Sequence, residues 1–155
     1  SNVICGFPGE TEADVDVLCE FLAAAELDAI GVFSYSAEEG TEALQLDGRH
    51  SPEEIETRRA RVADLADELV SQRAEARIGE KVQVLVEEAE REIIGRAAHQ
   101  GPEVDGNVRL ITGDRLKSGD LVDAVVADTD GADLVATTIL DQRVSSIIGR
   151  EITSR

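Results

Sequence analysis

The strongest constraint on the fold is a change of pattern at Gly79. Five short apolar runs follow it within residues 79–140, separated by Gly, Asp and Pro signals. Runs this short and this closely spaced are typical of strands in a small all-β unit. The pattern therefore predicts a five-stranded β-barrel of the OB type. The runs are KVQVLVEE (81–88), EIIGRAAH (92–99), NVRLIT (107–112), LVDAVVADT (121–129) and ADLVATT (132–138).

Before Gly79 the chain has the spacing of an α/β protein. Residues 3–7 and 28–35 are predicted as buried strands, and apolar residues recur at helical spacing from Thr11 to about Ala25. Two strands joined through a helix by short connections are normally parallel. A parallel sheet of two strands is not stable alone. We therefore interpret this unit as the end of a larger barrel or open sheet.

A second helix is predicted after Ser51. Serine is a favoured N-cap, Pro52 suits the first helical position, and the apolar face continues to about Arg77. The expected fold class is α/β plus β. The expected organisation is the end of an α/β domain at 1–50, a linking helix at 51–78, the barrel at 79–140 and a tail at 141–155.

The chain is strongly acidic, with a formal net charge of −18 over 155 residues. Residues 79–140 carry 13 acidic and 6 basic side chains and contain no Phe, Tyr or Trp. OB-type barrels that bind nucleic acid use basic grooves and stacking aromatic side chains. The composition therefore argues against nucleic acid and for a cationic protein partner, and simple solubility is the alternative interpretation of the charge.

Other features narrow the possible classes. No apolar stretch approaches the ~20 residues of a membrane-spanning helix, so we expect no membrane partner and a cytoplasmic location. The spacing of Cys5 and Cys19 indicates neither a disulfide framework nor a zinc site, and both are expected to be buried packing residues. His50 and His99 are isolated, which is more typical of structural or exposed histidines than of catalytic ones.

Several ordered motifs together resemble a known family. They are ICGFPGETEAD (4–14), IGVFSYSAEEGTEA (30–43), an Arg-rich helix and GRAAHQGPEVDG (95–106). This order is similar to the C-terminal part of the methylthiotransferases, radical S-adenosylmethionine enzymes with an appended TRAM domain. The resemblance implies that residues 1–50 end the radical domain, a partial barrel, and that 79–140 form the TRAM domain.

Residues 101–106 are most similar to one branch of that family. The branch methylthiolates the β-carbon of an aspartate in a small-subunit ribosomal protein, so the implied partner is a basic ribosomal protein. Sister branches modify tRNA adenosines. A tRNA methylthiotransferase is therefore one alternative, and a stand-alone OB-type binding module without enzymatic activity is another.

The resemblance also implies a cofactor site. The segment Gly-Phe-Pro-Gly-Glu at 6–10 would end a late barrel strand at the mouth where S-adenosylmethionine sits, and its two glycines allow close backbone approach. The alternative is a tight turn without a ligand, with aromatic side chains that only pack. The predicted cofactor-binding residues are Gly6, Phe7, Gly9, Glu10, Phe33 and Tyr35.

The cluster chemistry of the family lies outside this sequence. Its two four-iron four-sulfur clusters need Cys-x-x-x-Cys-x-x-Cys and three further cysteines, which Cys5 and Cys19 do not match. We therefore expect a C-terminal fragment of a longer protein that binds no cluster, has no catalytic or metal-binding residue and is inactive alone. Glu103 and Asp105 are the predicted substrate-binding residues, with a plain turn as the alternative.

Overall fold

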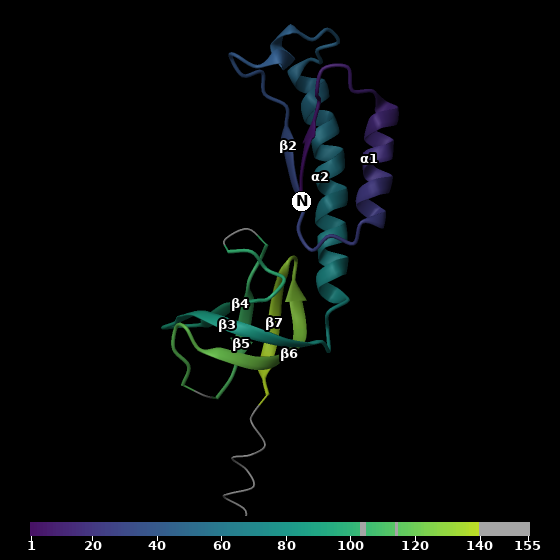
Figure 1. Ribbon diagram of the computed structural model, residues 1–155. Coiled ribbons are helices and arrows are strands. Elements are labelled where there is room, and N and C mark those ends of the chain that lie inside the picture. The colour runs from purple at the N-terminus through teal and green to yellow at the C-terminus, as the bar shows by residue number, and fades with distance from the viewer. Residues whose placement is uncertain (103–104, 114, 140–155) are drawn as a thin grey trace, which may run out of the picture.

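The computed structural model describes residues 1–102, 105–113 and 115–139. Two units are joined by one long helix (Figure 1). The first unit contains β1 (Asn2–Cys5), α1 (Glu12–Ala24), β2 (Gly31–Ser34), a short 3₁₀ helix η1 (Glu42–Gln45) and α2 (Pro52–Glu75). β1 and β2 pair in parallel, with Ile4 beside Phe33. The predicted strand–helix–strand unit with parallel strands is confirmed.

Both strands of this unit are shorter than the sequence predicts. β1 ends at Cys5 rather than Phe7, because Gly6 has a φ of +83° and cannot continue an extended strand. β2 begins at Gly31 rather than Asp28. The 3₁₀ helix η1 lies in a segment for which the sequence predicts a loop.

Both α-helices begin where the sequence places their N-caps. The Asp14 N–H donates to the Thr11 hydroxyl at 3.3 Å, and the Thr11 N–H donates to the Asp14 carboxylate at 2.8 Å. Ser51 and Glu54 form the same reciprocal pair, with Pro52 in the first helical turn. These capping boxes satisfy N–H groups that have no partner inside the helix.

The helices cover one face of the two-stranded sheet, and their shared core contains the fully buried residues Cys5, Val15, Leu22 and Val62. Successive side chains of a strand point to opposite faces. Ile4 and Phe33 therefore lie on the other face, where they are 58% and 54% exposed. Parallel sheets are normally covered on both faces. The uncovered face is thus an apolar surface available to further elements or to a ligand.

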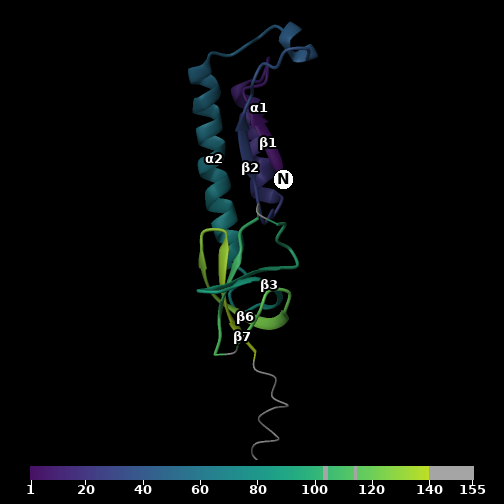
Figure 2. The ribbon, with the colours of Figure 1, turned by 90° about the vertical axis from the view of Figure 1, so that its left-hand side faces the viewer.

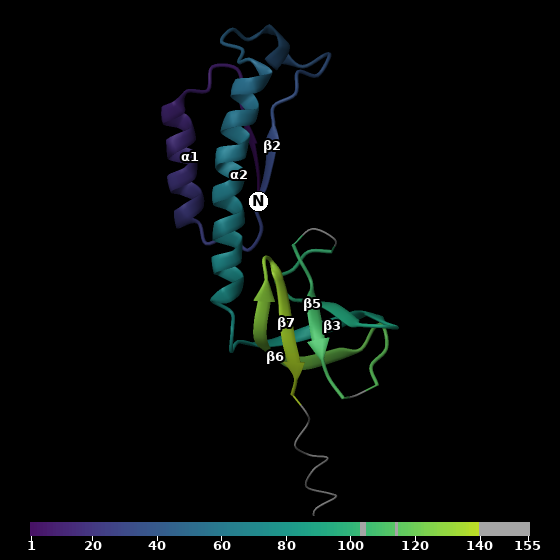
Figure 3. The ribbon, with the colours of Figure 1, turned by 180° about the vertical axis from the view of Figure 1, so that it is seen from behind.

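The second unit is a closed barrel of β3 (Lys81–Ala89), β4 (Ile93–Ala97), β5 (Val108–Ile111), β6 (Leu121–Asp130) and β7 (Asp133–Thr138). The strand order around it is β3-β4-β5-β7-β6, with β5 and β7 parallel and the other neighbours antiparallel (Figures 1 and 3). Alternate residues of β3, at Val82, Val84 and Val86, are buried in the interior. The predicted five-stranded OB-like barrel is confirmed.

The C-terminal end of α2 packs against the barrel (Figures 1 and 2). Ala74 is only 6% exposed and belongs to the barrel core. Arg77, just beyond the helix, donates to the Asp28 carboxylate at 2.6 Å and to the Glu80 carboxylate at 2.8 Å. Arg73 also contacts Asp28, at 3.2 Å. The Arg77 guanidinium therefore links the loop before β2 to the start of the barrel.

Among the helices that the structure describes, none combines the length and the apolar character needed to cross a bilayer.

Candidate functional site

Directly after β1 the chain makes a tight turn at residues 6–10, called here the 6–10 turn. The Glu10 N–H donates to the Phe7 carbonyl at 3.0 Å, and the Gly6 N–H donates to the Glu10 carboxylate at the same distance. Glu10 thus closes the turn through both its backbone and its side chain. The Glu10 side chain is only 12% exposed, so its carboxylate is largely removed from water.

The two glycines of the turn have different surroundings. Both have a positive φ, +83° at Gly6 and +87° at Gly9, which other residues rarely adopt. A Cβ at Gly6 would meet the side chain of Ile55 on α2 at 2.6 Å, whereas a Cβ at Gly9 would meet nothing within 4 Å. The Gly9 N–H donates to the Gly48 carbonyl at 2.9 Å. Protein therefore fills the space beside Gly6, and the space beside Gly9 is open.

Arg58 of α2 holds the turn from the helix side. Its Nη1 lies 2.9 Å from the Glu10 carbonyl oxygen and 3.2 Å from the Glu10 carboxylate, and its Nε lies 2.8 Å from the Glu12 carboxylate. Nη1 is also 3.2 Å from Nε2 of His50. Desolvation lowers the pKa of Arg58, but hydrogen bonds to Glu12 and Glu10 raise it overall, so the side chain stays cationic.

Aromatic side chains lie beside the turn and on the uncovered sheet face. Phe7 is 45% exposed, and its ring meets that of Tyr35 edge to face, with centroids 5.4 Å apart and an interplanar angle of 76°. The Tyr35 hydroxyl is buried and has no hydrogen-bond partner among the described residues. Buried hydroxyls normally have one. The donor and the acceptor of the Tyr35 hydroxyl are therefore both unused within the described chain.

Five of the six predicted cofactor residues thus separate into two groups, and the sixth, Gly9, has open space beside it. Phe7 and Tyr35 are brought into contact, and Phe33 lies exposed on the sheet face opposite the helices. Gly6 and Glu10 have partners within the protein, since Ile55 fills the space beside Gly6 and Glu10 binds Arg58. Ligand binding at all of these positions stays a prediction.

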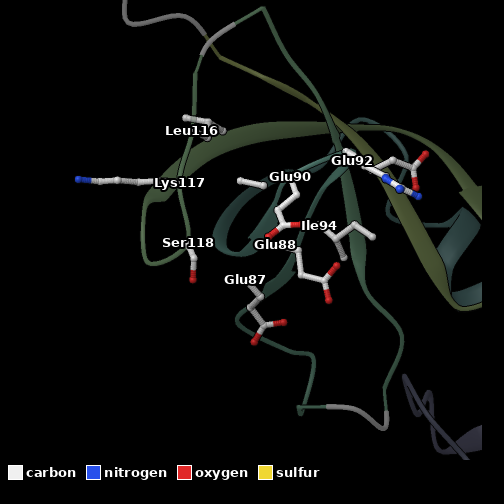
Figure 4. A pocket seen from close by; sticks show the side chains of 10 residues that line it. Glu87, Glu88, Glu90, Glu92, Ile94, Leu116, Lys117 and Ser118 are labelled. Carbon is white, nitrogen blue, oxygen red and sulfur yellow. The ribbon is translucent and has the colours of Figure 1, made fainter.

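The barrel carries an open groove of about 730 Å³ beside the turn that joins β3 to β4 (Figure 4). Ile94 and Leu116 contribute apolar surface to it, and Lys117 extends away from the glutamates. Glu87 pairs with Arg96 at 2.7 Å, whereas the other glutamates of the groove form no ion pair within the described part of the chain. Arg91 also lines the groove, so four glutamates against Arg91 and Lys117 give the lining a formal net charge of −2. Its glutamates are Glu87, Glu88, Glu90 and Glu92.

Neither of the two predicted substrate-binding residues is found among the residues that line this groove. Glu103 is not among the described residues. The Asp105 carboxylate accepts a hydrogen bond from the Gly101 N–H at 2.8 Å and lines a small cavity between the two units, together with Asp28 and His99. Burial, followed by the charge of Arg77, lowers the pKa of His99, so its ring is neutral near pH 7.

The cysteines behave as packing residues. Cys5 is fully buried, and Cys19 is partly buried against the same core. Burial, together with the charge of Glu10, raises the pKa of the Cys5 thiol and keeps it protonated. Across residues 1–102, 105–113 and 115–139, no three His, Cys, Asp or Glu side chains are grouped so that they could hold a metal ion.

Comparisons with known proteins agree with the motifs. The TRAM domain model matches residues 78–139, which contain the barrel. The ribosomal protein uS12 methylthiotransferase RimO of Cutibacterium acnes is 57% identical over 136 residues, covering 88% of this chain and 28% of that protein. The protein of the same name from Nocardioides sp. is 57% identical over 141 residues, covering 88% and 29%. That of Frankia casuarinae is 50% identical over 174 aligned positions, covering 100% and 33%.

The chain belongs to the methylthiotransferase family. It spans about a third or less of the length of these relatives and corresponds to a C-terminal part of them. The family resemblance inferred from the motifs is thereby confirmed.

Sequence reasoning missed two sets of residues in this family member. Arg58 lies 48 residues from Glu10 in the chain, and only the folded structure shows that they meet. The groove glutamates had a visible signal, because the segment EEAERE at 87–92 gathers four acidic side chains where one predicted strand ends and the next begins. A dense acidic turn in a barrel without aromatic residues is a reason to examine that turn for a basic partner.

Proposed function

We propose that this chain is the C-terminal part of an enzyme that methylthiolates the β-carbon of an aspartate in a small-subunit ribosomal protein. The observation that carries the proposal is the 50–57% identity to proteins named uS12 methylthiotransferase, over 88% to all of the chain. Such coverage includes residues of both units, so it exceeds what a shared barrel domain would give. A cytoplasmic location, where ribosomes are found, follows from this proposal.

S-adenosylmethionine fits the face formed by the 6–10 turn and the uncovered sheet surface. Phe7 and Phe33 offer exposed rings for stacking, and the Tyr35 hydroxyl lacks a partner among the described residues. The open space beside Gly9 lets a ligand approach the backbone, while Gly6 and Glu10 keep the turn in shape. The bound cofactor, with two four-iron four-sulfur clusters held elsewhere in the full-length enzyme, would supply the radical chemistry.

The barrel is proposed to receive the protein substrate. Ribosomal proteins are basic, and the groove presents Glu88, Glu90 and Glu92, which form no ion pair in the described chain although Arg91 lies among them. Exposed charges of opposite sign steer the encounter of two proteins and raise the association rate. The loop at 101–106, with Glu103 and Asp105, is a second candidate contact that the same experiment can separate from the groove.

The test is charge reversal in the full-length enzyme. Glu88→Lys with Glu90→Lys should slow association with the ribosomal protein about tenfold at low salt, because steering depends on the local field. The difference from the parent should shrink in salt, since the Debye length falls from about 10 Å at 0.1 M to about 3 Å at 1 M. Glu103→Lys with Asp105→Lys gives the corresponding measurement for the loop.

A matched control places the same charge change elsewhere. Asp64→Lys with Asp67→Lys alters exposed positions of α2, away from the barrel groove, and should leave the association rate within about twofold of the parent. Normal association of both barrel variants would refute the proposed docking. Tight binding of tRNA by the parent enzyme, with methylthiolation of tRNA and not of the ribosomal protein, would favour the tRNA branch instead.

A further inference from the structure

Two residues of α2 contact the 6–10 turn from the same side of the helix. Ile55 and Arg58 are three positions apart, so their side chains project in similar directions. Ile55 occupies the space beside Gly6, and Arg58 binds the carbonyl and the carboxylate of Glu10. The first and last residues of the turn are therefore both held by one helix.

The hydrogen bonds from Arg58 to the turn depend on the planar shape of its guanidinium group. Nη1 of Arg58 reaches two oxygens of Glu10 while Nε reaches Glu12 at 2.8 Å. The planar fork of arginine can engage separate acceptors at fixed angles, which the point charge of a lysine cannot. The side chains of Arg58 and Glu10 are only 11% and 12% exposed, so the hydrogen bond between them is little weakened by water, whereas Glu12 is 68% exposed.

Phe7 lies between the two held ends. Its ring is 45% exposed, and its one aromatic contact within the described chain is the edge-to-face contact with Tyr35. Because Phe7 belongs to the turn, the backbone of the turn sets where its ring can lie. We infer that Arg58 is a positioning residue, which sets the Phe7–Tyr35 pair for the adenosyl group of S-adenosylmethionine by fixing Glu10. This inference rests on the function proposed above.

The experiment uses the full-length enzyme with its clusters loaded. Equilibrium dialysis with S-adenosylmethionine should give a Kd about tenfold higher for Arg58→Gln than for the parent, the change expected for loss of one charge-assisted hydrogen bond. Arg58→Lys should show a smaller loss, because it keeps the charge but not the fork. Arg59→Gln is the matched control, since Arg59 pairs with Glu56 on the helix surface, and its Kd should stay within about twofold of the parent.

A second readout separates positioning from general damage to the fold. In steady-state kinetics, Arg58→Gln should raise the KM for S-adenosylmethionine while the KM for the ribosomal protein stays unchanged. If Arg58→Gln does not fold, Arg58→Lys carries the comparison. Equal Kd values for the parent and the folded Arg58 variants would overturn the inference alone. A parent enzyme that binds no S-adenosylmethionine would overturn the proposed function as well.

Discussion

Replacing Gly6 by alanine tests whether the 6–10 turn is shaped by contact with α2. Two effects of the substitution can be separated. The first is backbone strain, because Gly6 has a φ of +83°, in the left-handed region, where a residue with a Cβ is strained. The second is a steric clash, because the new Cβ would lie 2.6–2.9 Å from three carbon atoms of Ile55. Real Cβ atoms do not come this close, so the helix or the turn must move.

The magnitudes follow from the two effects. A non-glycine residue in the left-handed region costs about 1–2 kcal/mol. Overpacking a well-filled site by one methyl group costs about 1–3 kcal/mol. Gly6→Ala should therefore reduce the free energy of unfolding by about 2–5 kcal/mol. Gly9→Ala has nearly the same φ and no neighbour within 4 Å, so it should show only the backbone part, about 1–2 kcal/mol.

The assay is urea unfolding of the whole chain, followed by circular dichroism at a helix wavelength. The difference between Gly6→Ala and Gly9→Ala measures the clash. In an Ile55→Ala background that difference should shrink, because the two nearest of the three opposing carbon atoms are gone and only Cβ, at 2.9 Å, remains. Equal losses for the two glycine variants in the natural background would show that Ile55 yields freely and that α2 does not shape the turn.

Three further predictions concern stability and assembly. The pKa of His99 is lowered in the folded chain, so its contribution to stability is present above its ordinary pKa of 6.5 and is lost as the pH falls through the folded value. The unfolding midpoint should therefore decrease as the pH falls below 6.5, and His99→Gln should remove this pH dependence. Ser51→Ala removes the α2 cap and should cost about 1 kcal/mol in urea unfolding, and an unchanged midpoint would contradict the capping interpretation. This chain alone should bind no iron on anaerobic reconstitution, and formation of a stoichiometric cluster would contradict that expectation. It should bind a hydrophobic dye through its exposed apolar residues, and a monomer that binds no dye would contradict this one. The exposed apolar residues are Ile4, Phe33, Val17 and Phe21.

The parts of the fold that depend on residues close together in the sequence are predictable from it. Thr11 and Ser51 mark both helix starts, because a capping box involves residues only three positions apart. The barrel strands are predictable because alternate residues face the interior, as in β3 and β5. The sequence predicts an end of β1 at Phe7, because Phe7 is apolar like the residues of the strand. The strand ends earlier, at Cys5, because Gly6 has a positive φ.

The candidate site was less predictable, because its geometry joins distant segments. The family resemblance assigns Phe7 and Tyr35 to one cofactor site, and the two rings are in contact. The role of Glu10 in closing its own turn, and its bond to Arg58, depend on how α2 lies against the sheet. No local pattern specifies that placement.

The length of α2 has a consequence for which sequence changes the chain can accept. The helix has 24 residues, with Arg58 contacting the 6–10 turn near one end and Ala74 packed into the barrel near the other. One residue inserted between them would rotate the barrel by about 100° about the helix axis and advance it by about 1.5 Å. Seven inserted residues would nearly restore the direction but move the barrel about 10 Å further away. We therefore expect the number of residues between Arg58 and Ala74 to be maintained by selection more strictly than the identity of the exposed side chains between them.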